Sequence, residues 1–198
     1  MGSKPRRVAL STGLVAAIRA TAEVLSRHPG QGMVIGGIGV IARGVGRLTR
    51  DVDIAVAGHG GQAAAWLDEL GGAGLASRIP DAAAFAAETQ VLLLRHAASG
   101  VDVDMSFASL PFELEAIASA PLETIAGARV AIARAEDLVI YKSLAWRPQD
   151  QQDIERLLAL HGGVIDLERV RRHVSQLGEA LELDRWQELE ALIRRVLG

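Results

Sequence analysis

The sequence predicts a mixed α/β fold (α+β) with a helical C-terminal part. Short apolar segments typical of strands occur in the first two thirds of the chain, at Met33–Ile35, Val52–Ala57, Val91–Arg95, Val101–Phe107 and Arg129–Ala133. Beyond Ala135 only patterns with helical spacing follow. We therefore expect residues 1–133 to form a core with a mixed sheet flanked by helices, and residues 134–198 to form a helical subdomain packed on it.

Composition restricts the class of protein. The chain has 198 residues, 49% hydrophobic and 23% charged, so it can bury a core and is not of the disordered class. It has no cysteine, which excludes disulfides and thiolate metal ligands and is compatible with a reducing compartment. The N-terminal residues lack the apolar segment of a secretion signal, and no apolar run approaches the roughly 18 residues that span a bilayer. We expect a cytoplasmic protein with no membrane partner.

The elements can be placed in chain order. Residues 8–28 have the apolar spacing of an amphipathic helix that ends at His28-Pro29-Gly30. Val91–Arg95 and Val101–Phe107 are joined by a short turn at Ser99-Gly100 and are expected to form a hairpin. The remaining helices are expected at residues 38–43, 62–70, 111–120, 136–147, 148–160, 166–177 and 183–197.

Charge is distributed unevenly along the chain. Residues 1–60 contain 8 Lys and Arg against 3 Asp and Glu, a net charge of +5, whereas the remainder contains 13 against 21, a net charge of −8. A basic segment that also holds two aspartates suits an anionic ligand better than a membrane surface.

Two acidic pairs lie on predicted strands. Alternate strand residues face the same side, so Asp51 and Asp53 point together, and Asp102 and Asp104 do likewise. Carboxylate oxygens suit Mg²⁺, which binds one or two carboxylates together with substrate phosphates. A pair of such ions activates an attacking hydroxyl and stabilises a leaving pyrophosphate, and this chemistry usually takes a third carboxylate. A single acidic pair would be explained by a polar sheet face, but two pairs favour a metal site.

A glycine turn precedes the first acidic pair. Gly36 and Gly37 stand where a strand meets a helix, and glycines there let backbone N–H groups approach phosphate oxygens. Arg47, Thr49 and Arg50 follow and are of the residue types that donate charge-assisted hydrogen bonds to phosphates.

This combination resembles the nucleotidyltransferase fold of the DNA polymerase β type. Within that superfamily, the stretch GGIGVIARGVGRLTRDVDIAV is similar to the AbiEii/MenT-like nucleotidyltransferases, which are toxins of type IV toxin–antitoxin systems. A second block, from Glu136 through Lys142 and Arg147 to Asp153, is similar to the helical segment of that family. The two blocks span residues 33–158. One departure from the wider superfamily is Gly36-Gly37 in place of the usual Gly-Ser.

The resemblance implies a role for individual residues. Asp51, Asp53 and Asp104 would be catalytic carboxylates that hold two Mg²⁺ ions, with Asp102 the alternative third carboxylate. The nucleoside triphosphate substrate would contact Gly36, Gly37, Arg47 and Thr49, and Lys142 would bind a phosphate. Asp150 and Asp153 match the helical block, and helix capping or ion pairing explains them equally well.

The resemblance also implies an activity and partners. It implies transfer of a nucleoside monophosphate from an NTP such as ATP to an acceptor hydroxyl, on tRNA or another RNA, by a toxin with a cognate antitoxin. Alternative acceptors are a small molecule such as an antibiotic, or a protein hydroxyl. A further alternative is a nucleotidyltransferase fold that has lost catalysis and serves as a binding module.

Two unrelated site types fit less well. Gly37-x-Gly39-x-x-Ala42 imitates a dinucleotide-binding fingerprint, but the helix that follows is too short for a crossover and the acids come too early. A phosphatase with an aspartate nucleophile would need an apolar strand before Asp51, where the sequence has Arg47-Leu48-Thr49-Arg50.

Overall fold

The protein consists of two compact units. The computed structural model describes residues 9–180 and 182–198. Unit 1 contains the residues up to Ala42 together with Gly46–Ala133, and unit 2 contains Arg43–Val45 together with Arg134–Gly198. In the described part of the chain, no helix has the length and apolar character that crossing a membrane would need.

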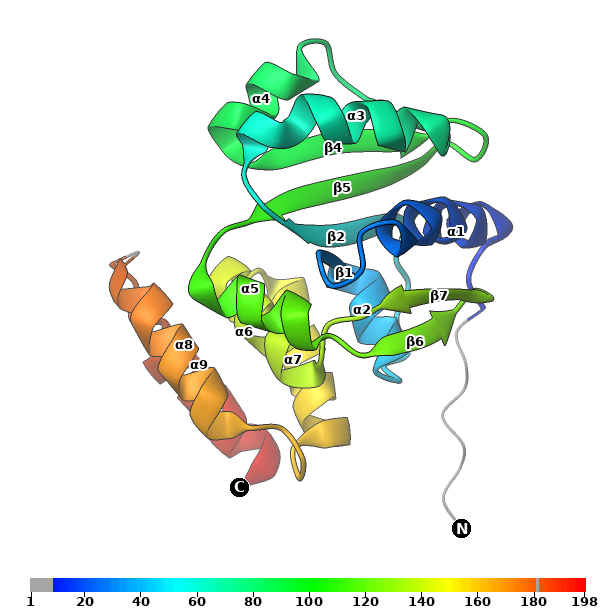
Figure 1. Ribbon diagram of the computed structural model, residues 1–198. Coiled ribbons are helices and arrows are strands. Elements are labelled where there is room, and N and C mark those ends of the chain that lie inside the picture. The colour runs from blue at the N-terminus through cyan, green and yellow to red at the C-terminus, as the bar shows by residue number, and fades with distance from the viewer. Residues whose placement is uncertain (1–8, 181) are drawn as a thin grey trace. The chain divides into compact units, whose positions relative to one another are not determined.

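Unit 1 is built on a five-stranded mixed sheet with the strand order β1-β2-β5-β4-β3 (Figure 1). The strands are β1 Gly32–Val34, β2 Asp51–Ala57, β3 Leu75–Ser77, β4 Val91–His96 and β5 Val101–Ala108. β2 and β5 run parallel, and the other neighbouring pairs are antiparallel. The predicted hairpin of β4 and β5 is confirmed, and so is the mixed sheet flanked by helices.

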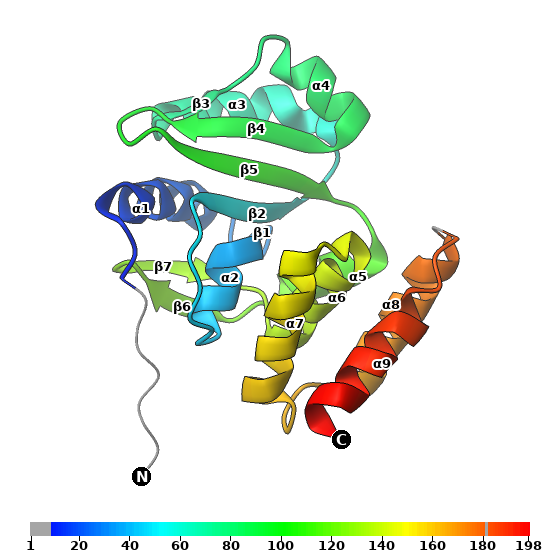
Figure 2. The same ribbon diagram turned by 180° about the vertical axis from the view of Figure 1, so that it is seen from behind.

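One face of the sheet is apolar and covered. The helices α1 Thr12–Ser26 and α3 Ala63–Gly72 lie on the same face in both views (Figures 1 and 2). Their buried side chains share a core cluster with the alternate residues of the central strands; these are Leu14, Ile18, Trp66 and Leu70 from the helices and Val52, Ile54, Val103 and Met105 from the strands. The strand residues between them therefore face the opposite side.

The helix predicted at residues 8–28 is α1, and it is shorter than expected. Ser11 begins it because the Ser11 Oγ accepts a hydrogen bond from the Leu14 N–H at 3.2 Å, which satisfies one of the open donors of the first turn. Val8 lies outside the described residues. The helix ends before the positive-φ residue Gly30, at which the chain turns into β1.

Three elements of unit 1 have no counterpart in the sequence prediction: β3, α4 Ala82–Thr89 and β6 Leu122–Ile125. β6 pairs antiparallel with β7 Ala128–Ala131 through a two-residue turn in which Ala126 and Gly127 have φ values of 54° and 76°. This turn type normally carries Asn or Gly at the first position, so Ala126 gives no sequence signal for a hairpin. Unit 1 also contains α2 Gly36–Ala42, α5 Pro111–Ser119 and the 3₁₀ turn Gly60–Gln62.

Unit 2 is helical, as the sequence predicts. Its helices are α6 Ala135–Ala145, α7 Pro148–His161, α8 Leu167–Ala180 and α9 Arg185–Leu197. Each presents apolar residues at helical spacing that are fully or almost fully buried, among them Leu138, Leu157, Val170 and Leu189. The short segment Arg43–Val45 also belongs to this unit, and the Arg43 carbonyl accepts a hydrogen bond from His161 at 2.6 Å.

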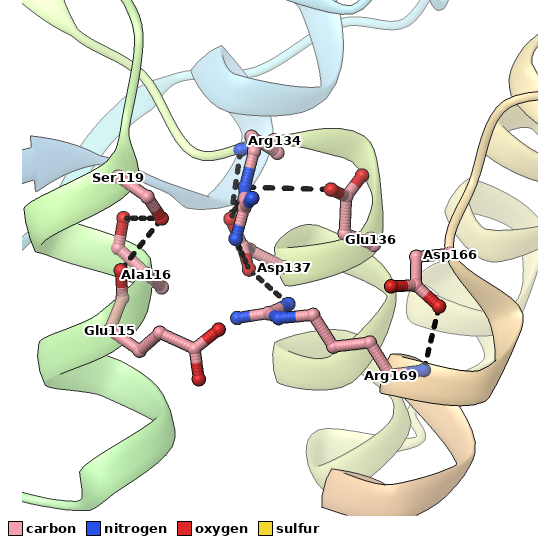
Figure 3. A network of polar contacts seen from close by, with 8 residues as sticks. All are labelled: Glu115, Ala116, Ser119, Arg134, Glu136, Asp137, Asp166 and Arg169. Atoms are coloured by element: carbon pink, nitrogen blue, oxygen red, sulfur yellow. Dashed lines mark hydrogen bonds and ion pairs between the residues drawn. The ribbon is translucent and has the colours of Figure 1, made fainter.

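Buried charges link the helices of unit 2. Asp137 is fully buried and accepts hydrogen bonds from Arg134 Nε at 3.0 Å and from Arg169 Nη1 at 2.6 Å (Figure 3). Lys142 on α6 lies between two carboxylates of α7, with Nζ 3.0 Å from Asp150 Oδ1 and 2.8 Å from Asp153 Oδ2. Each buried charge therefore has an opposite charge in contact, which offsets the cost of removing it from water.

Asp150 also caps α7. Its carboxylate accepts from the Arg147 backbone N–H at 3.2 Å and from Arg147 Nε at 2.7 Å. Burial raises the pKa of Asp150, but the hydrogen bonds and charges of Arg147 and Lys142 outweigh burial and place that pKa below its ordinary value. The ionised form of Asp150 thus stabilises the folded state.

We expect Asp150→Asn to destabilise the protein by about 2 kcal/mol at neutral pH, because it removes charge-assisted hydrogen bonds to a buried group. Since the folded-state pKa is lowered, this contribution is fully present above about pH 4 and is lost as the pH falls through the folded-state pKa. Urea unfolding at pH 7, 5 and 3 should show the difference between variant and wild type shrinking at pH 3. Asp68→Asn, at an exposed position, is the control; an unchanged difference at pH 3 would contradict the assignment.

Candidate active site

The parallel pairing of β2 with β5 brings the predicted carboxylates together. Asp51 pairs with Asp102 and Asp53 with Asp104, each directly across the ladder. Because in-register residues of parallel strands point to the same face, the four carboxylates share the side of the sheet that α1 and α3 leave open. The site thus combines residues that are about 50 positions apart in the sequence.

The glycine turn lies directly against this carboxylate face. Gly36 has a φ of 55°, and a Cβ atom added there would overlap the Asp53 carboxylate, so the position requires glycine. The Gly37 N–H donates to Asp53 Oδ2 at 3.4 Å. The two glycines therefore allow the backbone at the start of α2 to approach Asp53 without a side chain between them.

The segment before β2, residues 47–50, lies against the same glycine turn. Thr49 Oγ1 donates to Asp51 Oδ1 at 2.8 Å, and a Cβ atom added at Gly37 would overlap the Thr49 side chain. The Arg47 guanidinium carbon would be 3.5 Å from that Cβ atom. The predicted nucleotide-binding residues Gly36, Gly37, Arg47 and Thr49 are thus gathered around Asp51 and Asp53.

Two arginines of the site were not singled out by the sequence analysis. Arg78 follows β3 and bridges the second acidic pair: Nη1 donates to Asp102 Oδ2 at 2.8 Å, and Nη2 donates to Asp104 Oδ1. Arg95 on β4 donates from Nε to Asp102 Oδ1 at 2.7 Å. The one sequence signal for Arg95 was its place on a strand expected to pair with Val101–Phe107, and Arg78 had no such signal.

The two aspartates of β5 have opposite pKa shifts. The Arg95 hydrogen bond, with the charges of Arg78 and Arg95, holds the pKa of Asp102 below its ordinary value despite some desolvation. Burial raises the pKa of Asp104, and the negative charges of Asp51 and Asp102 add to this, although Arg78 acts in the opposite direction. Asp104 therefore binds a proton more readily than an ordinary aspartate.

Lys142 belongs to the other unit. Its ammonium is buried and engaged by Asp150 and Asp153, as described above. The match of Asp150 and Asp153 to the helical block thus corresponds to buried ion pairs and a helix cap within unit 2.

The residues of unit 1 suit a divalent cation by their donor chemistry. Among the described residues no three Asp, Glu, His or Cys side chains converge closely enough to enclose a metal ion by themselves. Mg²⁺, however, takes few protein carboxylates and completes its shell with water and phosphate oxygens. The guanidinium of Arg78 against Asp104 shows that this face already stabilises a positive charge. Asp51, Asp53 and Asp104 therefore fit Mg²⁺ as partial ligands.

A cavity of about 370 Å³ lies elsewhere in unit 1. It is lined by residues of the α1 C-terminus, α5 and the β6–β7 hairpin, including Leu25, Ile117 and Arg129. None of the predicted site residues lines it. The predicted site residues of unit 1 lie on or beside the carboxylate face, outside this cavity.

Solved structures with a similar fold include two of ANT(2'')-Ia. A solution structure of this antibiotic-resistance factor matches with a TM-score of 0.56 at 17% identity, covering 92% of this chain and 97% of that chain. A crystal structure of ANT(2'')-Ia in complex with adenylyl-2''-tobramycin matches with a TM-score of 0.53 at 18% identity, covering 86% and 99%. An antigenic nucleotidyltransferase-like protein from Paracoccidioides brasiliensis gives a TM-score of 0.55 at 14% identity, covering 93% and 94%.

At these identities the likeness shows the fold, which is of the nucleotidyltransferase type. No curated protein sequence matches the chain significantly. The AbiEii/MenT subtype stays a prediction. A family model described as "Nucleotidyl transferase of unknown function (DUF2204)" matches residues 15–185, which include both the β2–β5 carboxylates and most of unit 2. The protein is therefore a member of this nucleotidyl transferase family.

Proposed function

We propose that the protein is a Mg²⁺-dependent nucleotidyltransferase that moves a nucleoside monophosphate from an NTP to an acceptor hydroxyl. The observation that carries the proposal is the in-register pairing of β2 with β5, which sets Asp53 opposite Asp104 with Asp51 on the same face. Membership of a nucleotidyl transferase family supports the reaction class.

In this proposal Asp51, Asp53 and Asp104 hold two Mg²⁺ ions. When bound, the ions polarise the α-phosphate and neutralise the leaving pyrophosphate. The carboxylates orient the ions on the open face of the sheet, and Thr49 fixes the Asp51 carboxylate by its 2.8 Å hydrogen bond. Asp102 is the less suitable third ligand, since both of its oxygens already accept from arginines.

The glycine turn and the segment before β2 would bind the triphosphate. The start of α2 has no side chain at Gly36 or Gly37, and the Asp53 and Thr49 side chains lie against its backbone. The Gly37 N–H donates to Asp53 Oδ2, and in this proposal a phosphate oxygen would take the place of Asp53 as its acceptor. Arg47 lies beside Gly37 and would add a positive charge. Lys142 is a further proposed phosphate contact, and a phosphate would compete with Asp150 and Asp153 for its ammonium.

Asp104 is the proposed acceptor of the proton from the attacking hydroxyl. Asp104 lies on the same face of the sheet as Asp51 and Asp53, where the attacking hydroxyl would be held, so its carboxylate is placed to accept that proton. Arg78 holds the Asp104 carboxylate in place.

The acceptor that we propose first is RNA, with tRNA as the leading case, in a toxin that has a cognate antitoxin. This proposal rests on the similarity of the stretch GGIGVIARGVGRLTRDVDIAV to the AbiEii/MenT-like proteins and on the net charge of +5 in residues 1–60. Exposed Arg50 and half-buried Arg47 would offer positive charge to an RNA backbone next to the aspartates.

A small-molecule hydroxyl is the second candidate acceptor. The fold likeness to ANT(2'')-Ia, whose complex contains adenylyl-2''-tobramycin, favours an antibiotic of that chemical class. The net charge of −3 for the whole chain is also compatible with a cationic aminoglycoside. A protein hydroxyl is a further acceptor that the same site would accommodate, and a binding module without catalysis is the alternative to all three.

We expect Asp53→Asn and Asp51→Asn each to lower nucleotidyl transfer by at least about 100-fold, because each removes a ligand charge from the metal site. Transfer of α-³²P-labelled NTP measures the loss, and Asp68→Asn, which is exposed and away from this face, is the control. Thermal melts with Mg²⁺ and NTP should show stabilisation of the wild type that Asp53→Asn weakens. Full activity in both variants would overturn the site, and no stabilisation of the wild type would favour the inactive binding module.

We expect labelled nucleotide to appear on RNA when the protein is incubated with each α-labelled NTP and separate acceptor fractions. The fractions are total RNA, purified tRNA, a mixture of aminoglycosides and a protein extract, resolved by gel electrophoresis or thin-layer chromatography. Label on tRNA that is released by 3′-exonuclease supports the first candidate. Label on an aminoglycoside instead would contradict it and establish the second, and label on protein alone would contradict both.

A further inference from the structure

A chain of alternating charges runs along the carboxylate face of unit 1. Its members in order are Arg95, Asp102, Arg78 and Asp104. Every neighbouring pair is in direct contact, through hydrogen bonds of 2.7 Å for Arg95–Asp102 and 2.8 Å for Asp102–Arg78 and a further one for Arg78–Asp104. The last member is opposite Asp53 in the ladder, so the chain ends inside the proposed metal site.

Arg78 is held firmly within this chain. Its backbone N–H donates to the Leu93 carbonyl at 2.9 Å, which continues the β3–β4 ladder by one residue. Its side chain is 23% exposed, and its Nε is buried with no hydrogen-bond partner within residues 9–180 and 182–198. The two terminal nitrogens donate to different aspartates, Nη1 to Asp102 and Nη2 to Asp104.

The two aspartates contribute unequally to this contact. Asp102 uses Oδ2 for Arg78 and Oδ1 for Arg95, so both of its oxygens accept from a guanidinium. Asp104 uses Oδ1 for Arg78. Both oxygens of Asp102 are therefore engaged by arginines, whereas Arg78 engages only Oδ1 of Asp104.

Resting on the function proposed above, we propose that Arg78 is a positioning residue that competes with the divalent cation for Asp104. In the metal-free protein its guanidinium neutralises Asp104. When the metal binds, the guanidinium withdraws from Asp104 and stays anchored on Asp102, because two cations in contact with one carboxylate repel each other at short range. Arg78 thereby lowers the affinity for the free metal ion.

Arg78 also couples the metal to the nucleotide. A metal ion that arrives with a triphosphate brings negative charge, which offsets the repulsion from Arg78. The site is therefore selective for the metal–nucleotide complex over the bare cation. The ligand that the site selects is a divalent cation chelated by a polyphosphate.

The test is Mn²⁺ binding to the full-length protein, measured by the electron paramagnetic resonance signal of free Mn²⁺, without any nucleotide. Arg78→Gln should bind Mn²⁺ roughly tenfold more tightly than the wild type, as expected for the removal of one charge-assisted competitor. Arg95→Gln is the matched control, since it also loses a guanidinium contact to Asp102 but has none to Asp104; it should stay within about twofold of the wild type. Circular dichroism and a thermal melt confirm that each variant is folded.

Three outcomes would overturn the inference: unchanged or weaker Mn²⁺ binding by Arg78→Gln, an equal gain in Arg95→Gln, or a gain that persists when Asp104→Asn is added. With a non-hydrolysable NTP present, the advantage of Arg78→Gln should shrink, and an undiminished advantage would overturn the coupling. A different result would contradict the function proposed above: Mn²⁺ binding by Asp53→Asn and Asp104→Asn that equals binding by the wild type. If those two variants bind Mn²⁺ more weakly but Arg78→Gln binds it no more tightly than the wild type, the proposed metal site is supported and the proposed role of Arg78 is wrong.

Discussion

The parallel pairing of β2 with β5 is the interaction on which the site depends. It places Asp51, Asp53, Asp102 and Asp104 on one face of the sheet, in two in-register pairs. Four carboxylates so close together repel one another, and their ionised forms need positive charge nearby. Arg78 and Arg95 supply it to the β5 pair, and a hydroxyl and a backbone N–H supply hydrogen bonds to the β2 pair.

The opposite face of the same strands provides the stability that this arrangement requires. Val52, Ile54, Val103 and Met105 are at most 1% exposed and share one cluster with α1 and α3. The alternation of strand side chains thus separates a dry apolar layer from an acidic layer across a single sheet. A register shift of one residue would bury the aspartates, so the apolar core also fixes the position of the carboxylates.

In unit 2 several charged side chains are buried inside the helical core and paired with one another. Asp137, Lys142, Asp150 and Asp153 are almost completely buried, and each is satisfied by a partner within the unit. Such pairs contribute modestly to stability when intact and cost several kcal/mol when one partner is removed. They connect α6 to α7 through Lys142 and α6 to α8 through Asp137.

The sequence alone determined the elements with strong local patterns and the identity of the acidic residues. The alternation of apolar and polar residues predicted which side chains of β2 and β5 face the core. Gly36-Gly37 predicted a close approach of the backbone to phosphate, which stays a prediction; in the structure the groups next to these glycines are the Asp53 and Thr49 side chains. The sequence did not indicate β3, α4 or β6. β3 has only three residues, and the turn after β6 begins with alanine. The alanines of α4 favour a helix, but the segment has no apolar–polar periodicity that would mark it as one.

Only the tertiary structure decided how the acidic pairs are neutralised and which of them is open to a ligand. Arg78 is 24 and 26 residues from its partners, Asp102 and Asp104, and lies in a segment with no pattern of its own. The distinction between Asp102, saturated by two arginines, and Asp104, shared with one, depends on the antiparallel neighbours β3 and β4. Periodicity fixes the face on which a side chain lies, whereas its partners across the sheet follow from strand order, which local sequence does not encode.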